Sequence, residues 1–160
     1  MPEVRLLDAR VDGLDEPGLT ARARALSDAA GARFLSRSYR HPYALVAWHD
    51  QPVGVDIERI ERCDTAFAET ICTATERAAV WPHEHADRYL SALWSSKEAL
   101  AKALGNPLAY DPRHLESPSA WPRGRSGPWR ATALTTVPGH VAWLCWRTTA
   151  TGEHAEQREQ

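Results

Sequence analysis

The segment RYLSALWSSKEALAKALG, residues 88–105, constrains the fold more than any other part of this 160-residue chain. At 100° per residue, its apolar side chains share one face of a helix: Leu90, Leu93, Leu100, Ala101 and Leu104. Gly105 and the nearby Pro107 are a typical signal for the end of a helix. We therefore predict a long amphipathic helix whose apolar stripe packs on a sheet.

Apolar runs separated by turn residues predict the strands of that sheet. Residues 43–48 and 53–60 flank a short polar turn, so they are expected to form an antiparallel hairpin. Residues 129–136 and 140–146 flank Val-Pro-Gly and predict a second hairpin. Residues 4–11 have the apolar content of a further strand. The pattern favours an α+β fold with antiparallel pairing.

Two further helices are expected earlier in the chain. One spans about residues 16–35, with Thr20 as its candidate N-cap. The other spans residues 73–81, where Thr73 and Glu76 have the spacing of a capping box.

The remaining segments are polar. Residues 111–128 are rich in proline and predict a long loop, and residues 148–160 predict a flexible tail. We therefore expect a single domain over residues 1–147.

Composition narrows the classes of function. The net charge of −2 argues against general nucleic-acid binding, which needs a basic surface. No apolar run reaches the length of a membrane span, and the N-terminus carries acids and lacks the apolar core of a secretory signal. Three cysteines without close pairing favour a reducing compartment. We expect a cytoplasmic protein that binds neither nucleic acid nor membrane.

The lysines are confined to one place. Of 19 basic residues, 17 are arginine, and Lys97 and Lys102 both lie in the 88–105 helix. Chance in an arginine-rich chain is one explanation, and a need for a compact ammonium there is the other. Glu98 and Lys102 are four residues apart, which suits either a surface salt bridge or a site. Lys97 projects towards the apolar stripe, so it must snorkel or meet an anion.

Two acids on a strand suggest a metal. In GVDIERI, alternation places Asp56 and Glu58 on one face, about 7 Å apart. A solvated polar face is the plain interpretation of that pair. If the helix packs across this strand, Glu98 completes a three-carboxylate site suited to Mg²⁺, and a neighbouring lysine would hold a phosphate. The residues then predict a metal-dependent enzyme that acts on a phosphorylated or diphosphate ligand.

The two segments together resemble the paired signature of the 4′-phosphopantetheinyl transferases. The family pattern is roughly (V/I)-G-(I/V)-D-(I/V)-E followed by (F/W)-(S/C/T)-x-K-E-(A/S)-x-x-K, and the chain matches every fixed position: Gly54, Asp56, Glu58, Trp94, Ser95, Lys97, Glu98, Ala99 and Lys102. Because it has an acid at position 58, the chain resembles the surfactin-type branch of the family. Residues 72–81, with Glu76, resemble the intervening motif, and the resemblance covers about residues 43–146.

The resemblance implies the family's fold and activity. Such enzymes transfer the 4′-phosphopantetheine arm of coenzyme A to a serine of an apo acyl or peptidyl carrier protein, in fatty-acid, polyketide or nonribosomal peptide biosynthesis. By similarity, Asp56, Glu58 and Glu98 would bind Mg²⁺ or Mn²⁺. Glu98 would also be the catalytic base, Lys102 would stabilise charge on the phosphate, and Lys97 would assist phosphate binding.

The chain departs from the surfactin-type pattern in two ways. Where a Ser-His segment is usual, it has Ser38, then Tyr39, Arg40 and His41. Ser38 keeps its place, and Arg40 and His41 are the candidates for binding the coenzyme A nucleotide. The part before Asp56 is also short for a family whose surfactin-type members consist of two similar halves. A homo-oligomer would recover the second half, and a compact monomer is the alternative.

A rival hypothesis keeps the fold and loses the reaction. On that interpretation the chain would bind a nucleotide or a carrier protein, or carry out altered chemistry in a biosynthetic pathway. The retained acids and lysines favour the enzyme.

Overall fold

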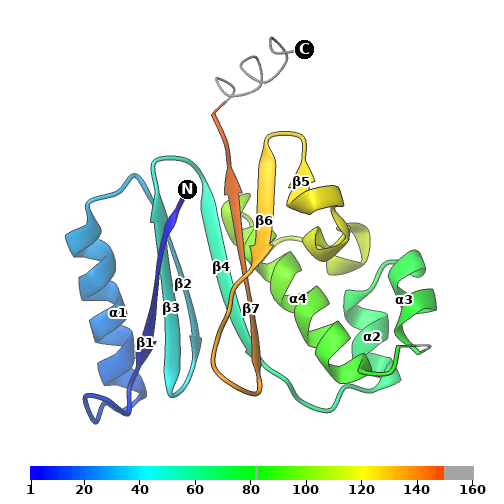
Figure 1. Ribbon diagram of the computed structural model, residues 1–160, viewed down its shortest axis with the longest axis horizontal. Helices are drawn as coiled ribbons and strands as arrows, with labels where there is room; N and C mark the ends of the chain where they lie inside the picture. Colours follow the sequence, from blue (N-terminus) through cyan, green and yellow to red (C-terminus); the bar gives the residue numbers. More distant parts are fainter. Residues whose placement is uncertain (82, 150–160) are drawn as a thin grey trace, which may run out of the picture.

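The computed structural model describes residues 1–81 and 83–149 and contains two antiparallel sheets (Figure 1). The first sheet has the strand order β1-β3-β2, formed by β1 (Glu3–Asp8), β3 (Tyr43–His49) and β2 (Phe34–Arg40). The second has the order β4-β7-β6-β5, formed by β4 (Val53–Arg59), β7 (His140–Arg147), β6 (Trp129–Ala133) and β5 (Arg125–Ser126). The predicted α+β class is confirmed.

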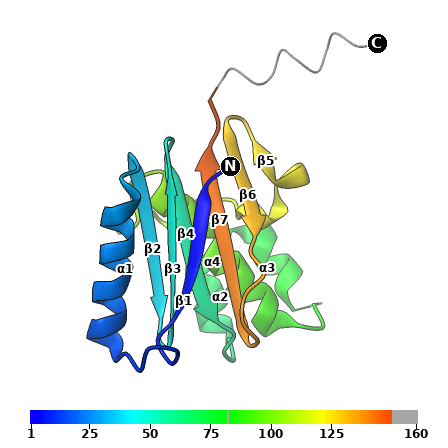
Figure 2. The ribbon, with the colours of Figure 1, turned by 60° about the vertical axis from the view of Figure 1, so that its left-hand side comes forward.

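Helices cover the two sheets from opposite sides. In Figures 1 and 2 the strands lie between α1 (Glu16–Ala30) and the long α4 (Ala86–Ala103). The short α2 (Thr65–Ile71) and α3 (Ala74–Val80) pack on the first half of α4. Three 3₁₀ turns follow α4: η1 (Pro112–His114), η2 (Pro118–Ala120) and η3 (Pro122–Gly124). None of the helices in the described residues has the length and apolar content needed to cross a membrane.

Helix α4 confirms the predicted amphipathic helix and its packing on a sheet. Its buried leucines Leu90, Leu93 and Leu100 contribute to two of the hydrophobic clusters. Against β4 the contact is so close that a Cβ added to Gly54 would lie 1.9 Å from the backbone oxygen of Ala99. The glycine of the GVDIE segment therefore lets strand and helix backbones touch.

Three local predictions are corrected. The first helix ends at Ala30, because Gly31 adopts the left-handed conformation (φ +60°), and its N-cap is Asp15, not Thr20. Phe34 and Leu35, at the end of the predicted helix, instead belong to β2.

The predicted 43–48/53–60 hairpin does not form. Strand β3 pairs on one edge with β1 and on the other with β2, so neither edge is open to β4, which pairs with β7. The β6–β7 hairpin and the α3 capping box are confirmed. The 111–128 segment is an extended excursion with 3₁₀ turns. Of the predicted flexible tail, residues 150–160 lie outside the described residues.

Serine side chains join the two sheets along β2 and β4. The backbone N–H of Val55 donates to Ser36 Oγ (3.0 Å), and that of Ile57 donates to Ser38 Oγ (3.1 Å). Residue numbers rise together in both strands, so they run in the same direction. We call the contacts of Ser36 and Ser38 with β4 the serine seam. They supply acceptors for N–H groups of β4 that do not hydrogen-bond to β7.

Candidate active site

Asp56 lies at the centre of the site, where β4 meets the serine seam and α4. The residue is 3% exposed. Its Oδ1 accepts hydrogen bonds from Ser38 Oγ (2.9 Å) and from Lys102 Nζ (2.8 Å). Its Oδ2 is buried and has no hydrogen-bond partner. A buried carboxylate oxygen without a donor is costly, so this atom is a candidate ligand for a cation.

Lys102 reaches across from the last turn of α4 to the strand. Besides Asp56, its ammonium donates to the backbone oxygen of Val55 (3.0 Å). The side chain is 21% exposed, so the ammonium sits at the rim of the buried acid. Lys102 therefore pairs with the acid on β4 and not with Glu98 on its own helix.

Glu58, on the same face of β4 as Asp56, accepts hydrogen bonds from two side chains. Arg40 donates to its Oε2 through Nε (2.7 Å) and lies within 2.6 Å of it through Nη2. Trp94 Nε1 donates to Oε1 (3.1 Å). Burial, reinforced by the charge of Asp56, raises the pKa of Glu58 to about 7 despite these donors.

Glu98 faces the same acids from α4. The Tyr110 hydroxyl donates a short hydrogen bond to its Oε1. Burial is the main cause that raises the pKa of Glu98, and the charge of Asp56 adds to it. The charge of Asp56 acts on both glutamates, so the three carboxylates influence one another electrostatically.

The acids do not yet form a coordination sphere. Among residues 1–81 and 83–149, no three His, Cys, Asp or Glu side chains are gathered as a ready metal centre. Each carboxylate is turned towards a donor of its own: Lys102, Arg40 or Tyr110. The donor set nevertheless fits a hard divalent cation, because it offers carboxylate oxygens and includes the unpartnered Oδ2 of Asp56.

Lys97 is not available for phosphate binding, which corrects the expectation for this residue. It is 0% exposed. Its ammonium donates to Ile71 O (2.7 Å), Glu76 Oε2 (2.6 Å) and Pro112 O (2.7 Å). An ammonium has three donors, and all three are used. The anion that Lys97 requires is therefore Glu76.

The other predicted nucleotide ligands divide into two groups. Ser38 and Arg40 are brought to the acids, where they bind Asp56 and Glu58. His41 lies on the exposed turn after β2, and its Nε2 is 3.5 Å from the backbone oxygen of Leu14. The structure thus separates His41 from the carboxylates.

Sequence reasoning assigned no role at the acids to Trp94 or Tyr110. Trp94 is a fixed position of the motif, and its indole N–H contacts Glu58. Tyr110 lies in the segment after α4, where no periodicity indicates which way a side chain points. Its only sequence signal is an aromatic hydroxyl shortly after the helix that carries Glu98.

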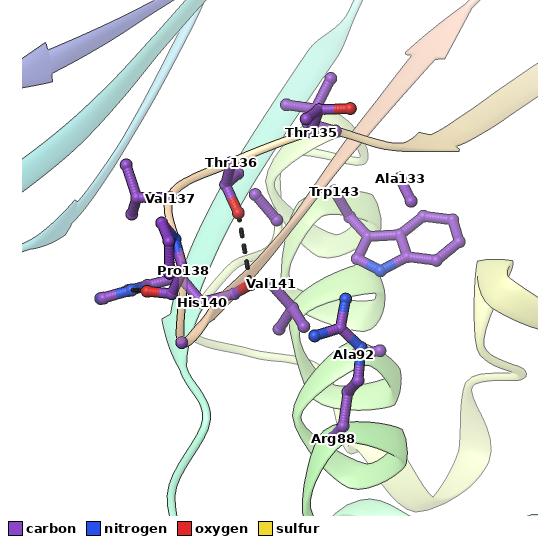
Figure 3. Close-up of a pocket in the computed structure, with 13 residues that line it drawn as sticks. Arg88, Ala92, Ala133, Thr135, Thr136, Val137, Pro138, His140, Val141 and Trp143 are labelled. Atoms are coloured by element: carbon purple, nitrogen blue, oxygen red, sulfur yellow. Dashed lines mark hydrogen bonds between the residues drawn. The ribbon is translucent and has the colours of Figure 1, made fainter. Parts of the chain in front are cut away.

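Two cavities open on the elements that carry the acids. One, of about 400 Å³, borders Glu58 and is lined by Arg40, Arg59, Phe67 and Trp94, among others. The other, of about 580 Å³, lies between the start of α4 and the β6–β7 hairpin, with Arg88 and Trp143 on its wall (Figure 3). None of the three acids lines the second cavity.

Comparison with known proteins decides the family. The model of the 4′-phosphopantetheinyl transferase superfamily matches residues 52–143, more than half of the chain. The chain belongs to this superfamily. The matched span contains Asp56, Glu58, Glu98 and Lys102.

Individual relatives share between a fifth and a third of their residues with this chain. The chain is 31% identical over 128 residues to the 4′-phosphopantetheinyl transferase psf-1 of Bacillus pumilus, with 74% of this chain and 55% of that protein covered. It is similar to the crystal structure of Thermotoga maritima holo-[acyl-carrier-protein] synthase with a TM-score of 0.48 and 21% identity, over 61% of this chain and 63% of that one. The chain thus spans about half the length of the curated relative.

Proposed function

We propose that this protein transfers the 4′-phosphopantetheine arm of coenzyme A to a serine of an apo acyl or peptidyl carrier protein. The observation that carries the proposal is the convergence of Asp56, Glu58 and Glu98 with Lys102 where β4 meets α4. Membership of the superfamily supports it, since these positions lie in the matched region.

The three carboxylates would hold Mg²⁺ or Mn²⁺. When bound, the cation would neutralise charge on the coenzyme A diphosphate. Asp56 Oδ2 has no donor but is buried, so it must be uncovered before a cation can reach it, and Glu58 must release Arg40 from Oε2. Arg40 can move, since its side chain is 48% exposed.

The transfer requires one bond to form and one to break. The carrier serine oxygen attacks the phosphorus that bears the pantetheine arm, and the bond to the adenosine bisphosphate breaks. Glu98 takes the serine proton, for which its place on α4 beside Asp56 and Lys102 suits it. Lys102 stabilises the charge that develops on the phosphate oxygens.

Ser38 and Arg40 would act around this centre. Ser38 is buried and bound to Asp56, so it orients that carboxylate and does not itself reach the nucleotide. Arg40, once released from Glu58, is the nearest basic side chain for a coenzyme A phosphate. We propose no nucleotide role for Lys97, whose donors are all engaged.

The test is intact-mass spectrometry of several apo carrier proteins after incubation with the protein, coenzyme A and Mg²⁺. We expect a gain of one phosphopantetheine arm that disappears with EDTA and in Glu98→Gln and Asp56→Asn. Glu16→Gln, an exposed glutamate at the start of α1, is the matched control and should retain full transfer. Coenzyme A binding without any mass gain would favour the rival, a binding protein of the same fold.

Assembly and location belong to the same proposal. We further propose that the protein self-associates, which light scattering after gel filtration would detect as a mass above that of one chain. Its cysteines Cys63, Cys72 and Cys145 are free thiols, which supports a cytoplasmic location.

A further inference from the structure

Tyr110 and Pro112 lie at the two ends of a short segment that is fixed to neighbouring residues of α4. The Tyr110 hydroxyl donates to Glu98, and Lys97 donates to the backbone oxygen of Pro112 (2.7 Å). Lys97 and Glu98 are consecutive in the helix, so each holds one end of residues 110–112. The helix therefore holds the segment at two points: through the buried ammonium of Lys97 and through the carboxylate of Glu98, the proposed base.

The chain returns to the helix in an ordered way. After α4, the N–H of Gly105 donates to Lys102 O (3.1 Å) and that of Asn106 to Ala101 O (3.0 Å), which caps the helix. Gly105 has φ +81°, so it provides the reversal. The N–H of Ala109 then donates to Asn106 O (3.3 Å), forming the turn before Tyr110.

Lys97 ties this segment to the helices behind it. Its ammonium also binds Ile71 O at the end of α2 and Glu76 in α3. Glu76 in turn accepts from the N–H of Ser117 through Oε1 (2.8 Å). The segment after α4 is therefore held on both sides of Tyr110–Pro112: by exposed turns before it and by the buried Lys97, Glu76 and Ser117 after it.

We propose that Tyr110 is a positioning residue for Glu98, supported by Lys97 through Pro112. The inference rests on the proposed function, because it assigns a role in presenting the base and metal ligand of that reaction. Tyr110 binds one oxygen of Glu98 and so limits the rotation of the carboxylate. The other oxygen is left for the cation and the incoming serine.

The test uses Tyr110→Phe, which removes only the hydroxyl. Two quantities are measured: Mn²⁺ affinity of the protein without substrates, by electron paramagnetic resonance, and kcat with KM for coenzyme A. Loss of a group that orients a metal ligand typically costs about 10–100-fold, so we expect Mn²⁺ affinity and kcat to fall by roughly 10-fold. KM for coenzyme A and the melting temperature should stay within error, a split that a purely structural role would not produce.

Tyr89→Phe is the matched control. Tyr89 is a half-buried tyrosine of α4 whose ring stacks on His83, a contact that the phenylalanine keeps. It should change neither quantity. Unchanged Mn²⁺ affinity and kcat in Tyr110→Phe would overturn the proposal. If the wild-type protein binds Mn²⁺ but transfers nothing, the proposed reaction is wrong, and the Mn²⁺ affinity of Tyr110→Phe alone decides the role of Tyr110. If the wild-type protein binds no Mn²⁺, both the proposed reaction and the role of Tyr110 are wrong.

The support from Lys97 is tested by a double-mutant cycle. Lys97→Met should lower Mn²⁺ affinity in the wild-type background and much less in the Tyr110→Phe background, because it acts through the same contact. Equal effects in both backgrounds would overturn the part assigned to Lys97. Should Lys97→Met fail to fold, Lys97→Met with Glu76→Gln removes both buried charges and serves in its place.

Discussion

Replacing Glu58 by glutamine should stabilise the protein while removing a proposed metal ligand. Burial and the charge of Asp56 raise the pKa of Glu58 from 4.5 to about 7. Because the folded state binds this proton more tightly than the unfolded state, stability falls as the pH rises from about 4.5 to about 7. At about 1.4 kcal/mol per pKa unit, the ionised side chain costs on the order of 3 kcal/mol above that window.

A carboxamide of nearly the same shape avoids most of this cost. Its oxygen can still accept from Trp94, whereas Arg40 loses its partner and returns to solvent. We therefore expect Glu58→Gln to be more stable than wild type by about 1–3 kcal/mol at pH 8 and nearly equal to it at pH 4.5. The difference should grow mainly between those values.

Urea denaturation at several pH values, with EDTA present, measures this difference. Glu16→Gln, exposed and far from the acids, should show no comparable pH dependence relative to wild type. In a second series without EDTA, added Mg²⁺ should stabilise wild type and have a smaller effect on Glu58→Gln. A stability difference that stays constant with pH, or a variant less stable than wild type at pH 8, would refute the reasoning.

Three further substitutions have expected outcomes. Lys97→Met should lower the free energy of unfolding by about 3–5 kcal/mol, because it leaves Glu76 charged and buried, and adding Glu76→Gln should recover part of the loss in urea denaturation. Gly54→Ala should prevent folding or lower the denaturation midpoint severely, since its Cβ would overlap the α4 backbone; native-like circular dichroism and an unchanged midpoint would contradict the packing. Arg40→Ala should raise the KM for coenzyme A in steady-state kinetics, because it removes the nearest basic side chain for a phosphate, and an unchanged KM would contradict that role.

Much of the site was predictable because its residues lie in strongly periodic elements. Alternation along β4 correctly placed Asp56 and Glu58 together, and the amphipathic stripe of α4 brought Glu98 and Lys102 over that strand. Local rules suffice when the apolar face of an element determines its orientation.

What could not be predicted depends on non-local contacts. The turn between β3 and β4 suggests a hairpin, but β1 and β2 occupy both edges of β3, and nothing near the turn reveals this. The burial of Lys97 likewise depends on Glu76 and Pro112, which come from other segments. Tyr110 is reached only after an irregular turn, for which sequence periodicity has no equivalent.

The serine seam has a consequence for how this protein can change over generations. Main-chain pairing is open to almost any sequence, whereas a hydroxyl that accepts from a strand is supplied only by a few side chains, chiefly Ser and Thr. Ser38 meets two demands at once, since it accepts from Ile57 N–H and donates to Asp56. A single base change at that codon can therefore remove the hydroxyl that joins Ile57 and Asp56 while every carboxylate remains. Descendants that lost the proposed activity in this way would still carry the full signature of acids and lysines.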